Sequence, residues 1–361
     1  MNKILIQRPR TNDGGLANYF NSLKDKFVFD IVFFYRGAKD WPEKKGYFET
    51  VFRIINDYIS FAKIVHKKEY SLIHLNIFFD FKGLLRESVF LIISKLFKRK
   101  VIVFFRGWNM STKERIEKHY LSLFKLIYFK ADSIIVLSST EQKILKSWGY
   151  KKPLYIETTV VDDSLIKSVS REFLDTKFTN VQNYRLLFLS RVEKAKGIYE
   201  TIDAFNLLKD KYKNLQLTIA GVGSELDNVK EYIQKHNISD IYFEGFVSGK
   251  KKIEVFNNSH IFIFPSYSEG MPNAVLEAFS FGLPVITRYV GGLVDIFQND
   301  VNGFITESKD PVVFAGYIEK LIVDKELTKE ISMYNYKYAQ ENFISTIVVK
   351  RLEKIYKSLL D

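Results

Sequence analysis

The chain of 361 residues contains no cysteine, only seven prolines and only five histidines. The lack of cysteine excludes disulfide bonds and thiolate metal sites, and it fits a reducing cytoplasm. The histidines show none of the spacings that bind a metal ion, so we expect no metal. No run approaches the roughly 18 apolar residues of a membrane span, and the apolar run at the N-terminus is too short for the core of a signal peptide. We therefore expect a cytoplasmic protein, soluble or peripheral on a membrane.

The positive charge lies in the first half of the chain. Residues 1–165 contain 29 Lys and Arg against 17 Asp and Glu, a net charge of +12, whereas residues 166–361 contain 25 of each. Hydrophobic residues make up 47% and charged residues 27%, which is typical of a folded globular protein. The asymmetry indicates an anionic surface or partner for the first half.

Short apolar segments alternate with longer amphipathic ones, notably 81–97 and 113–129, which predicts parallel βαβ units of an α/β fold. The segment Val101–Phe105 is apolar at every position, as in a strand covered on both faces. In the first half we expect strands at Lys3–Ile6, Phe27–Phe34, Leu72–Leu75, Val101–Phe105, Ser133–Leu137 and Leu154–Ile156. In the second half we expect them at Tyr184–Leu189, Leu215–Ala220, Ile241–Phe243, Ile261–Phe264 and Pro284–Thr287.

The chain is long enough for two domains of ordinary size. Residues 162–182 are polar and poor in apolar repeats, so we place the linker there. The pattern predicts one domain over residues 1–165 and a second over residues 183–343. Residues 344–361 read as an amphipathic helix.

The most informative segment is 265–287. It reads as the end of a strand, a loop broken by glycine and proline, a helix and a further strand. In a parallel sheet such a loop lies at the carboxyl edge, where ligands bind. Glu269 lies on the loop and Glu277 about one turn into the helix, so both carboxylates can reach one crevice.

The backbone of Gly270, Met271, Pro272 and Asn273 opens this helix and would face an anion such as a diphosphate. A carboxylate accepts hydrogen bonds in pairs, which suits the vicinal hydroxyls of a sugar or ribose. A nucleotide sugar has both parts. The alternative interpretation is a plain strand, loop and helix with two solvated glutamates.

Glu269 and Glu277 resemble the Glu-x7-Glu signature of the retaining glycosyltransferases of family 4, the glycosyl transferases group 1. The resemblance is dense from about residue 184 to 310 and thin before 180. It implies the GT-B fold, in which two Rossmann-like domains face each other across a cleft and the C-terminal helix crosses back to the first domain. It also implies metal-independent, cofactor-free transfer of a sugar from a nucleoside diphosphate sugar to a saccharide acceptor. We expect that acceptor to be lipid-linked, in cell-surface polysaccharide or glycan assembly.

The resemblance also assigns roles within the site. Arg191 and Lys196 resemble the pair that clamps the donor diphosphate and neutralises charge on the leaving nucleotide. Glu277 would hold the ribose hydroxyls, and Glu269 would hold the transferred sugar. Arg191, Lys196 and Glu269 are therefore the catalytic candidates. Taken alone, two basic residues in a loop are equally well explained as surface charge.

Further donor-binding candidates come from three other loops. Gly223 resembles the glycine-rich turn of the family, although a tight structural turn explains it equally well. Phe246 and Val247 match the segment beside the nucleotide base, which main-chain groups would read. Gly15 resembles the loop of the first domain that reaches the diphosphate. The alternative there is a helix start capped by Asp13.

On the acceptor or sugar side, Arg106 stands where family members often carry a histidine near the reacting sugar. Its fixed positive charge would suit an anionic group. Asn76, near the end of a strand, is the second candidate on this side. The helix predicted over residues 81–97 ends in basic residues, and it either packs on the sheet or docks on anionic lipid. Docking would place the protein on the inner face of the membrane.

Two alternative functions remain. A sugar-nucleotide epimerase of the same fold acts on the nucleotide sugar without an acceptor. A nucleic-acid-binding protein would fit the basic first half, but such proteins spread stacking aromatics among basic residues on a recognisable module. The sequence contains no such module and its second half is neutral. We therefore expect no nucleic-acid partner.

Overall fold

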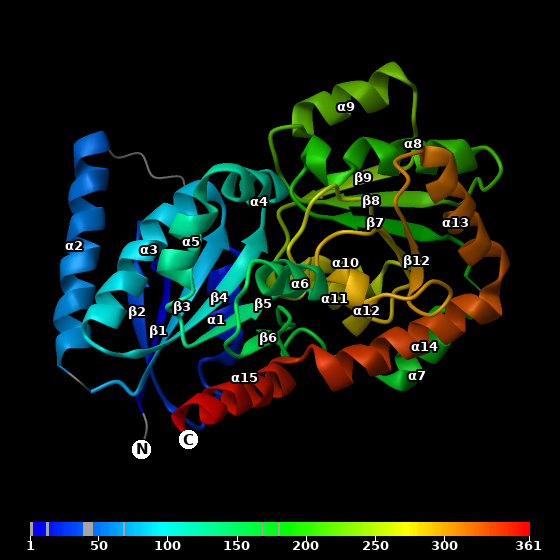
Figure 1. Ribbon diagram of the computed structural model, residues 1–361. Helices are drawn as coiled ribbons and strands as arrows, with labels where there is room; N and C mark the ends of the chain where they lie inside the picture. Colours follow the sequence, from blue (N-terminus) through cyan, green and yellow to red (C-terminus); the bar gives the residue numbers. More distant parts are fainter. Residues whose placement is uncertain (1–2, 12–13, 39–45, 68, 168, 180) are drawn as a thin grey trace. The chain divides into compact units, whose positions relative to one another are not determined.

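The computed structural model describes residues 3–11, 14–38, 46–67, 69–167, 169–179 and 181–361 (Figure 1). Asp13, the predicted helix cap, lies outside these residues. The chain divides into two compact units: unit 1 is Met1–Val160 with Ser345–Asp361, and unit 2 is Val161–Ile344. Each unit contains one six-stranded sheet, and all the strand pairs are parallel. The predicted α/β fold with two Rossmann-like units is confirmed.

The sheet of unit 1 has the strand order β2-β1-β3-β4-β5-β6. β3 and β4 are longer than predicted, and their register shifts so that Ile77 pairs with Phe105 and Phe78 with Gly107. Arg106 is therefore the extra residue of a bulge, a feature that redirects a side chain at the end of a strand. The strands are β1 Lys3–Pro9, β2 Asp30–Arg36, β3 Leu72–Phe79, β4 Lys100–Trp108, β5 Ser133–Val136 and β6 Leu154–Ile156.

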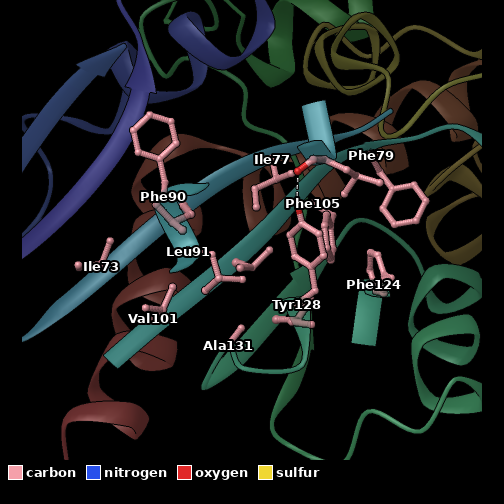
Figure 2. Close-up of a cluster of buried hydrophobic side chains, with 14 of the residues drawn as sticks. Ile73, Ile77, Phe79, Phe90, Leu91, Val101, Phe105, Phe124, Tyr128 and Ala131 are labelled. Carbon is pink, nitrogen blue, oxygen red and sulfur yellow. Dashed lines mark hydrogen bonds between the residues drawn. The ribbon is translucent and has the colours of Figure 1, made fainter. Parts of the chain in front are cut away.

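An aromatic core fills one face of this sheet (Figure 2). The rings of Phe79 and Phe105 lie 5.3 Å apart, edge to face, and those of Phe124 and Tyr128 lie 4.7 Å apart. The predicted helix over residues 113–129 is interrupted by a π-helical turn, Ile116–Tyr120. The helices of unit 1 are α1 Gly15–Leu23, α2 Tyr47–His66, α3 Phe81–Leu96, α4 Met110–Arg115, α5 Leu121–Tyr128, α6 Ser139–Ser147 and α15 Ser345–Leu360.

The sheet of unit 2 has the strand order β12-β11-β10-β7-β8-β9. The chain crosses from one side of β7 to the other after β9, so β7 and β10 flank the switch point where ligands bind in such sheets. The strands are β7 Arg185–Leu189, β8 Gln216–Ala220, β9 Ile241–Gly245, β10 Ile261–Phe264, β11 Val285–Arg288 and β12 Gly303–Thr306. The helices are α7 Arg171–Lys177, α8 Ile198–Lys209, α9 Leu226–Lys235, α10 Gly249–Asn257, α11 Asn273–Ser280, α12 Leu293–Ile296, α13 Pro311–Val323 and α14 Lys325–Asn342.

The segment assigned to the linker is part of unit 2. It contains α7, whose N-cap Ser170 accepts a hydrogen bond of 3.1 Å from the backbone N–H of Phe173. Leu174 is fully buried, and α7 packs against α14. The apolar residues of this segment are too few to show a period in the sequence, yet enough to hold one short helix on a neighbour.

Candidate functional site

The loops after β7, β8, β10 and β11 pack against one another at the carboxyl edge of the unit 2 sheet. A Cβ on Gly223, after β8, would lie 2.2 Å from the carbonyl oxygen of Val192, after β7. A Cβ on Gly291, after β11, would lie 2.0 Å from the carbonyl oxygen of Gly270, after β10. Only glycine allows such approaches, so the predicted turn at Gly223 is a place where two loops touch.

Lys196 and Glu269 form the centre of this edge. The Lys196 Nζ lies 2.6 Å from Glu269 Oε1, and the two side chains are only 13% and 15% exposed. Glu269 also accepts a hydrogen bond of 2.8 Å from the hydroxyl of Ser266. The backbone N–H of Tyr267 donates to the carbonyl of Ala195 at 2.9 Å. The structure thus joins two predicted site residues that lie 73 positions apart in the sequence.

Arg191 is separate from this pair. Its side chain is 68% exposed, and its Nη1 donates to Glu193 Oε1 at 2.7 Å. Arg191 follows β7, as does the 3-10 turn Lys194–Lys196 that carries the site lysine. Because its partner is a solvent-accessible residue two positions away, the guanidinium can change partner with little loss of packing.

Glu277 has a partner that the sequence analysis missed. Lys252, on α10, places its Nζ 2.8 and 2.9 Å from the two carboxylate oxygens of Glu277. The Lys252 and Glu277 side chains are 20% and 11% exposed. In the sequence, Lys252 is one of three consecutive lysines and carries no signal that separates it from the other two.

The helix α11 begins between Glu269 and Glu277, the acidic members of the two ion pairs. Pro272 is the N-cap and Asn273 the first helical residue, while Met271 is buried. The carbonyl of Gly270 accepts a hydrogen bond of 2.6 Å from the backbone N–H of Gly292. Pro272 has no N–H, so the predicted amide donors of this turn come from its neighbours.

Phe246 and Val247 lie on the loop between β9 and α10. The Phe246 ring is 76% exposed, whereas Val247 is buried. The loop therefore presents one aromatic ring to solvent a few residues before Lys252. Exposed aromatic rings of this kind offer a surface on which a nucleobase can stack.

The remaining predicted residues lie in unit 1. Gly15 is the first residue of α1. Asn76 is fully buried, and its Oδ1 accepts a hydrogen bond of 2.8 Å from the Nε of Arg106. Its Nδ2 donates to the carbonyl of Gln7 at 2.7 Å. The structure therefore brings Arg106 and Asn76 together, while their place on the acceptor or sugar side stays a prediction.

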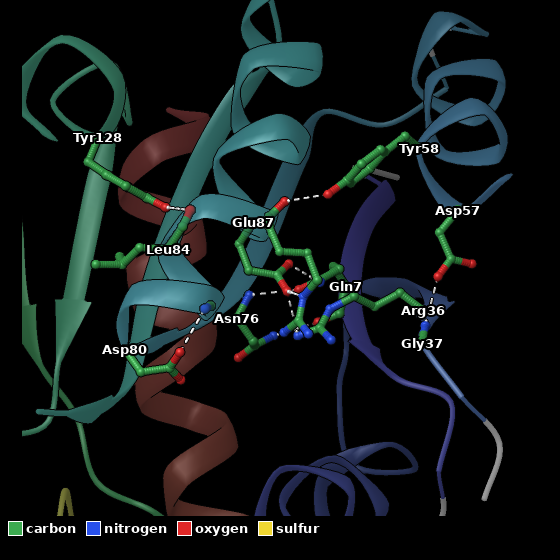
Figure 3. Close-up of polar contacts among 12 residues, drawn as sticks. Gln7, Arg36, Gly37, Asp57, Tyr58, Asn76, Asp80, Leu84, Glu87 and Tyr128 are labelled. Atoms are coloured by element: carbon green, nitrogen blue, oxygen red, sulfur yellow. Dashed lines mark hydrogen bonds and ion pairs between the residues drawn. The ribbon is translucent and has the colours of Figure 1, made fainter. Parts of the chain in front are cut away.

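Unit 1 also contains a buried carboxylate that the sequence analysis missed (Figure 3). Glu87 is fully buried on α3 and accepts a hydrogen bond of 2.6 Å from Gln7 Nε2. It also pairs with Arg36 at 2.8 Å and Arg86 at 2.7 Å. Asn76 binds the same Gln7 side chain through its backbone N–H, at 3.1 Å. This network fixes the orientation of Asn76 and hence of the Arg106 side chain.

Comparison with known proteins finds a family match for the C-terminal part of the chain. The model of the family described as Glycosyl transferases group 1 matches residues 170–338, within unit 2. The capsular polysaccharide biosynthesis glycosyltransferase CapM of Staphylococcus aureus is 28% identical over 271 residues, 71% of this chain and 69% of that protein. An uncharacterized glycosyltransferase of Methanocaldococcus jannaschii is 28% identical over 282 residues, 75% of this chain and 71% of that protein.

Solved structures show the same fold along nearly the whole chain. The sucrose-phosphate synthase of Thermosynechococcus elongatus superposes with a TM-score of 0.78 at 17% identity, over 99% of each chain. Anabaena HepE, in complex with UDP and glucose, gives a TM-score of 0.72 at 18% identity, over 99% of this chain and 100% of that one. With a match to the glycosyl transferases group 1 over residues 170–338 and the GT-B fold along nearly its whole length, the chain is similar to the family 4 glycosyltransferases of this group.

Proposed function

We propose that this protein is a retaining, metal-independent glycosyltransferase that moves a sugar from a nucleoside diphosphate sugar to a saccharide acceptor in polysaccharide assembly. The observation that carries the proposal is the ion pair of Lys196 and Glu269 at the carboxyl edge of a parallel sheet. The relatives support it: CapM is described as an enzyme of capsular polysaccharide biosynthesis, and the HepE structure holds UDP and glucose.

In this proposal Lys196, Glu269 and Glu277 bind different parts of the donor. Lys196 binds the diphosphate as a point charge, and the N-terminus of α11 adds its partial positive charge. Glu269 accepts hydrogen bonds from the transferred sugar, and Glu277 accepts them from the ribose. Among the described residues, no group of three or more His, Asp or Glu could hold a metal ion. The cations for the diphosphate in this proposal are side chains.

The reaction is a same-face substitution. The bond between the anomeric carbon and the diphosphate oxygen breaks, and the acceptor hydroxyl attacks the same face of the sugar. Its proton passes to the leaving phosphate oxygen. Negative charge grows on the diphosphate as the bond opens, so Lys196 acts mainly by stabilising the transition state. Arg191 joins it by exchanging Glu193 for a phosphate oxygen.

The acceptor in this proposal is lipid-linked and binds unit 1 at an anionic membrane surface. The support is an apolar stripe on α2, where Phe48 is 86% exposed, Phe52 75%, and Ile55 and Ile59 49% each. These residues recur every three to four positions, so they lie on one face of the helix. No helix in the described ranges is long and apolar enough to cross a bilayer.

The proposal places membrane docking on α2 rather than on α3. Leu84, Phe90 and Leu91 of α3 are buried against the sheet, whereas Leu85, Ile92 and Leu96 of the same helix are 56%, 38% and 73% exposed. The packing interpretation therefore holds for the buried face of α3. Vesicle flotation tests α2: a Phe48→Ser/Phe52→Ser variant should lose binding to anionic vesicles, whereas Leu207→Ser, an exposed residue of unit 2, should keep it. Equal flotation of all the proteins on neutral and anionic vesicles would remove membrane docking from the proposal.

The donor is tested by thermal shift with UDP- and GDP-sugars, followed by calorimetry and turnover with the donor that binds. Lys196→Ala should lower kcat/KM by about 100-fold, as for the loss of one donor to a developing charge. The matched control is Lys194→Ala, two residues away and 72% exposed, which should change it less than threefold. Equal losses in both variants would contradict the role given to Lys196.

Three further measurements separate the parts of the proposal. Arg191→Ala should lower turnover more than donor affinity, and a pure affinity loss would limit Arg191 to binding. Glu277→Ala should weaken nucleotide binding in calorimetry, and unchanged affinity would remove the ribose assignment. EDTA should leave activity intact, and inactivation reversed by Mn²⁺ would contradict metal independence. The anomeric configuration of the product, read by NMR, decides retention.

A further inference from the structure

Arg106 carries a charge in unit 1 without a carboxylate partner among the described residues. Its guanidinium carbon lies 3.5 Å from the ring centre of Phe104 and 3.9 Å from that of Tyr19, so the group packs against two aromatic rings, which are perpendicular to each other. Its Nε donates to Asn76, a neutral amide. Arg36, another buried guanidinium of unit 1, has Glu87 at 2.8 Å, whereas Arg8 donates to Asn21 and to the carbonyl of Ala17. Cation–π contacts offset part of the cost of burying Arg106, but they add no counter-charge.

Two groups at this place can donate further hydrogen bonds. The Nη2 of Arg106 and the hydroxyl of Tyr19 are both buried and interact with each other, and neither donates to any further group in the part of the chain that the structure describes. Tyr19 is only 2% exposed. Burial raises the pKa of Tyr19 to about 12 while the neighbouring Arg106 opposes the rise, so the hydroxyl keeps its proton at neutral pH. A buried donor without an acceptor is costly unless a ligand or water supplies one.

The carboxylate that acts electrostatically on Arg106, Glu157, already has partners. Glu157 accepts hydrogen bonds from Arg351 at 2.6, 3.0 and 3.1 Å and from the backbone N–H of Thr158 at 2.8 Å. It acts on Arg106 only as a more distant charge. Both oxygens of Glu157 already accept hydrogen bonds, so it cannot turn to the guanidinium without leaving Arg351 unpaired.

The helix that carries Tyr19 favours the same kind of ligand. α1 begins at Gly15 with no side-chain cap and no acidic residue in its first turn. Its partial positive charge is therefore not offset by an acidic side chain of its own first turn. Phe104 and Tyr19 both pack against the guanidinium, so a ligand would meet it at an edge, where Nη2 has no further partner among the described residues. A planar carboxylate or a phosphate oxygen fits an edge of this kind.

We propose that Arg106 and Tyr19 bind an anionic group, a carboxylate or a phosphate, on the saccharide substrate that contacts unit 1. This inference rests on the proposed function and narrows it, since it gives that substrate a negative charge. Arg106 supplies the charge and one N–H, and Tyr19 supplies a hydroxyl hydrogen. Asn76 is a positioning residue, because it holds the Nε and is itself held by Gln7.

Binding of three sugars to the full chain tests the site without any nucleotide. The probes are glucuronate, glucose 6-phosphate and glucose, compared by calorimetry or ligand-observed NMR at low salt. We expect one of the two anionic sugars to bind at least tenfold more tightly than glucose, and its identity distinguishes a carboxylate from a phosphate. Arg106→Gln should abolish this preference, Arg106→Lys should restore part of it, and Tyr19→Phe should weaken it several-fold. Lys118→Gln, which removes an exposed cation of the same unit, is the matched control and should change nothing.

Two results would overturn the inference: equal binding of the three sugars to the parent chain, or an anionic preference that survives in Arg106→Gln. Tyr19→Phe removes a single oxygen and keeps the ring on the guanidinium, so it remains informative if Arg106→Gln does not fold. An arginine with only a structural role would change the thermal midpoint without changing sugar selectivity. The assay contains no donor, so its outcome is independent of the Lys196 tests, whose failure would be read on unit 2.

Discussion

Removing the Lys252 ammonium should destabilise unit 2, because the Glu277 carboxylate would be left buried without its partner. The pair has two hydrogen bonds, of 2.8 and 2.9 Å, and its side chains are 20% and 11% exposed. Breaking a fully buried pair by removing one partner costs about 3–5 kcal/mol. Since a fifth of Lys252 reaches solvent, which can hydrate part of the charge, we expect about 2 kcal/mol for Lys252→Met. Methionine keeps the apolar stem in place.

A double-mutant cycle isolates the interaction. The unfolding free energies of Lys252→Met, Glu277→Gln and the double variant are measured by urea titration followed through the signal of unit 2. We expect a coupling energy of about 1–3 kcal/mol, since the two groups touch. The matched control is the exposed pair of Lys320 and Asp300, at 2.6 Å and 48% and 55% exposed, which should couple by less than about 1 kcal/mol. A coupling between Lys252 and Glu277 no larger than this control would refute the reasoning.

Three further perturbations have directions that the structure fixes. Gly291→Ala places a Cβ 2.0 Å from the Gly270 carbonyl oxygen, so the loop that carries Glu269 must move. This variant should lower kcat/KM at least about tenfold. The control Gly316→Ala, which has open space around its Cβ, should leave kcat/KM unchanged. Burial lowers the pKa of His74 from 6.5 to about 3, so between these values the unfolded chain binds a proton that the native chain does not. His74 should therefore lower stability with decreasing pH across that window, by at most about 1.4 kcal/mol per unit. Thermal midpoints of His74→Phe should fall less steeply, and the slope that remains includes His260, whose pKa burial also lowers to about 3. Burial lowers the pKa of Lys177 from 10.5 to about 7, so stability should rise with pH between 7 and 10.5, and Lys177→Met should flatten that rise and melt higher at pH 7.5.

The sequence predicts the central strands well and the edges poorly. β10 has its predicted bounds, because its four apolar residues are buried on both faces and the chain breaks after them. β12, Gly303–Thr306, was not predicted: it is a four-residue edge strand that begins with glycine, so neither length nor composition marks it. α2 was also not predicted, since its apolar residues follow a helical period on a face that is exposed rather than buried.

The same limit applies to the candidate site. The loop positions of Lys196 and Glu269 follow from the rule that ligands bind at the carboxyl edge of a parallel sheet, and the resemblance names these residues. Which charges meet is decided by tertiary structure. Arg191 pairs locally with Glu193, and Lys252 reaches Glu277 from another helix, 25 residues away. A run of three lysines gives no indication of which one is buried, because that depends on the angle at which α10 packs.

The charged site residues of the two units differ in whether they have an oppositely charged partner before any substrate binds. This difference affects how a substrate can bind to each unit. In unit 2, Glu269 and Glu277 each already hold a lysine. Under the proposed reaction, an incoming diphosphate competes with Glu269 for Lys196. Once the diphosphate has replaced Glu269 as the partner of Lys196, the largely buried Glu269 carboxylate can accept further hydrogen bonds. The hydroxyls of the transferred sugar can donate them. Diphosphate binding and sugar positioning thus become one coupled step under the proposed reaction. In unit 1, Arg106 has no carboxylate to release within the described chain, so an anion bound there gains its attraction without displacing a partner. For that reason the preference for an anionic over a neutral ligand should be stronger at Arg106 than at Lys196.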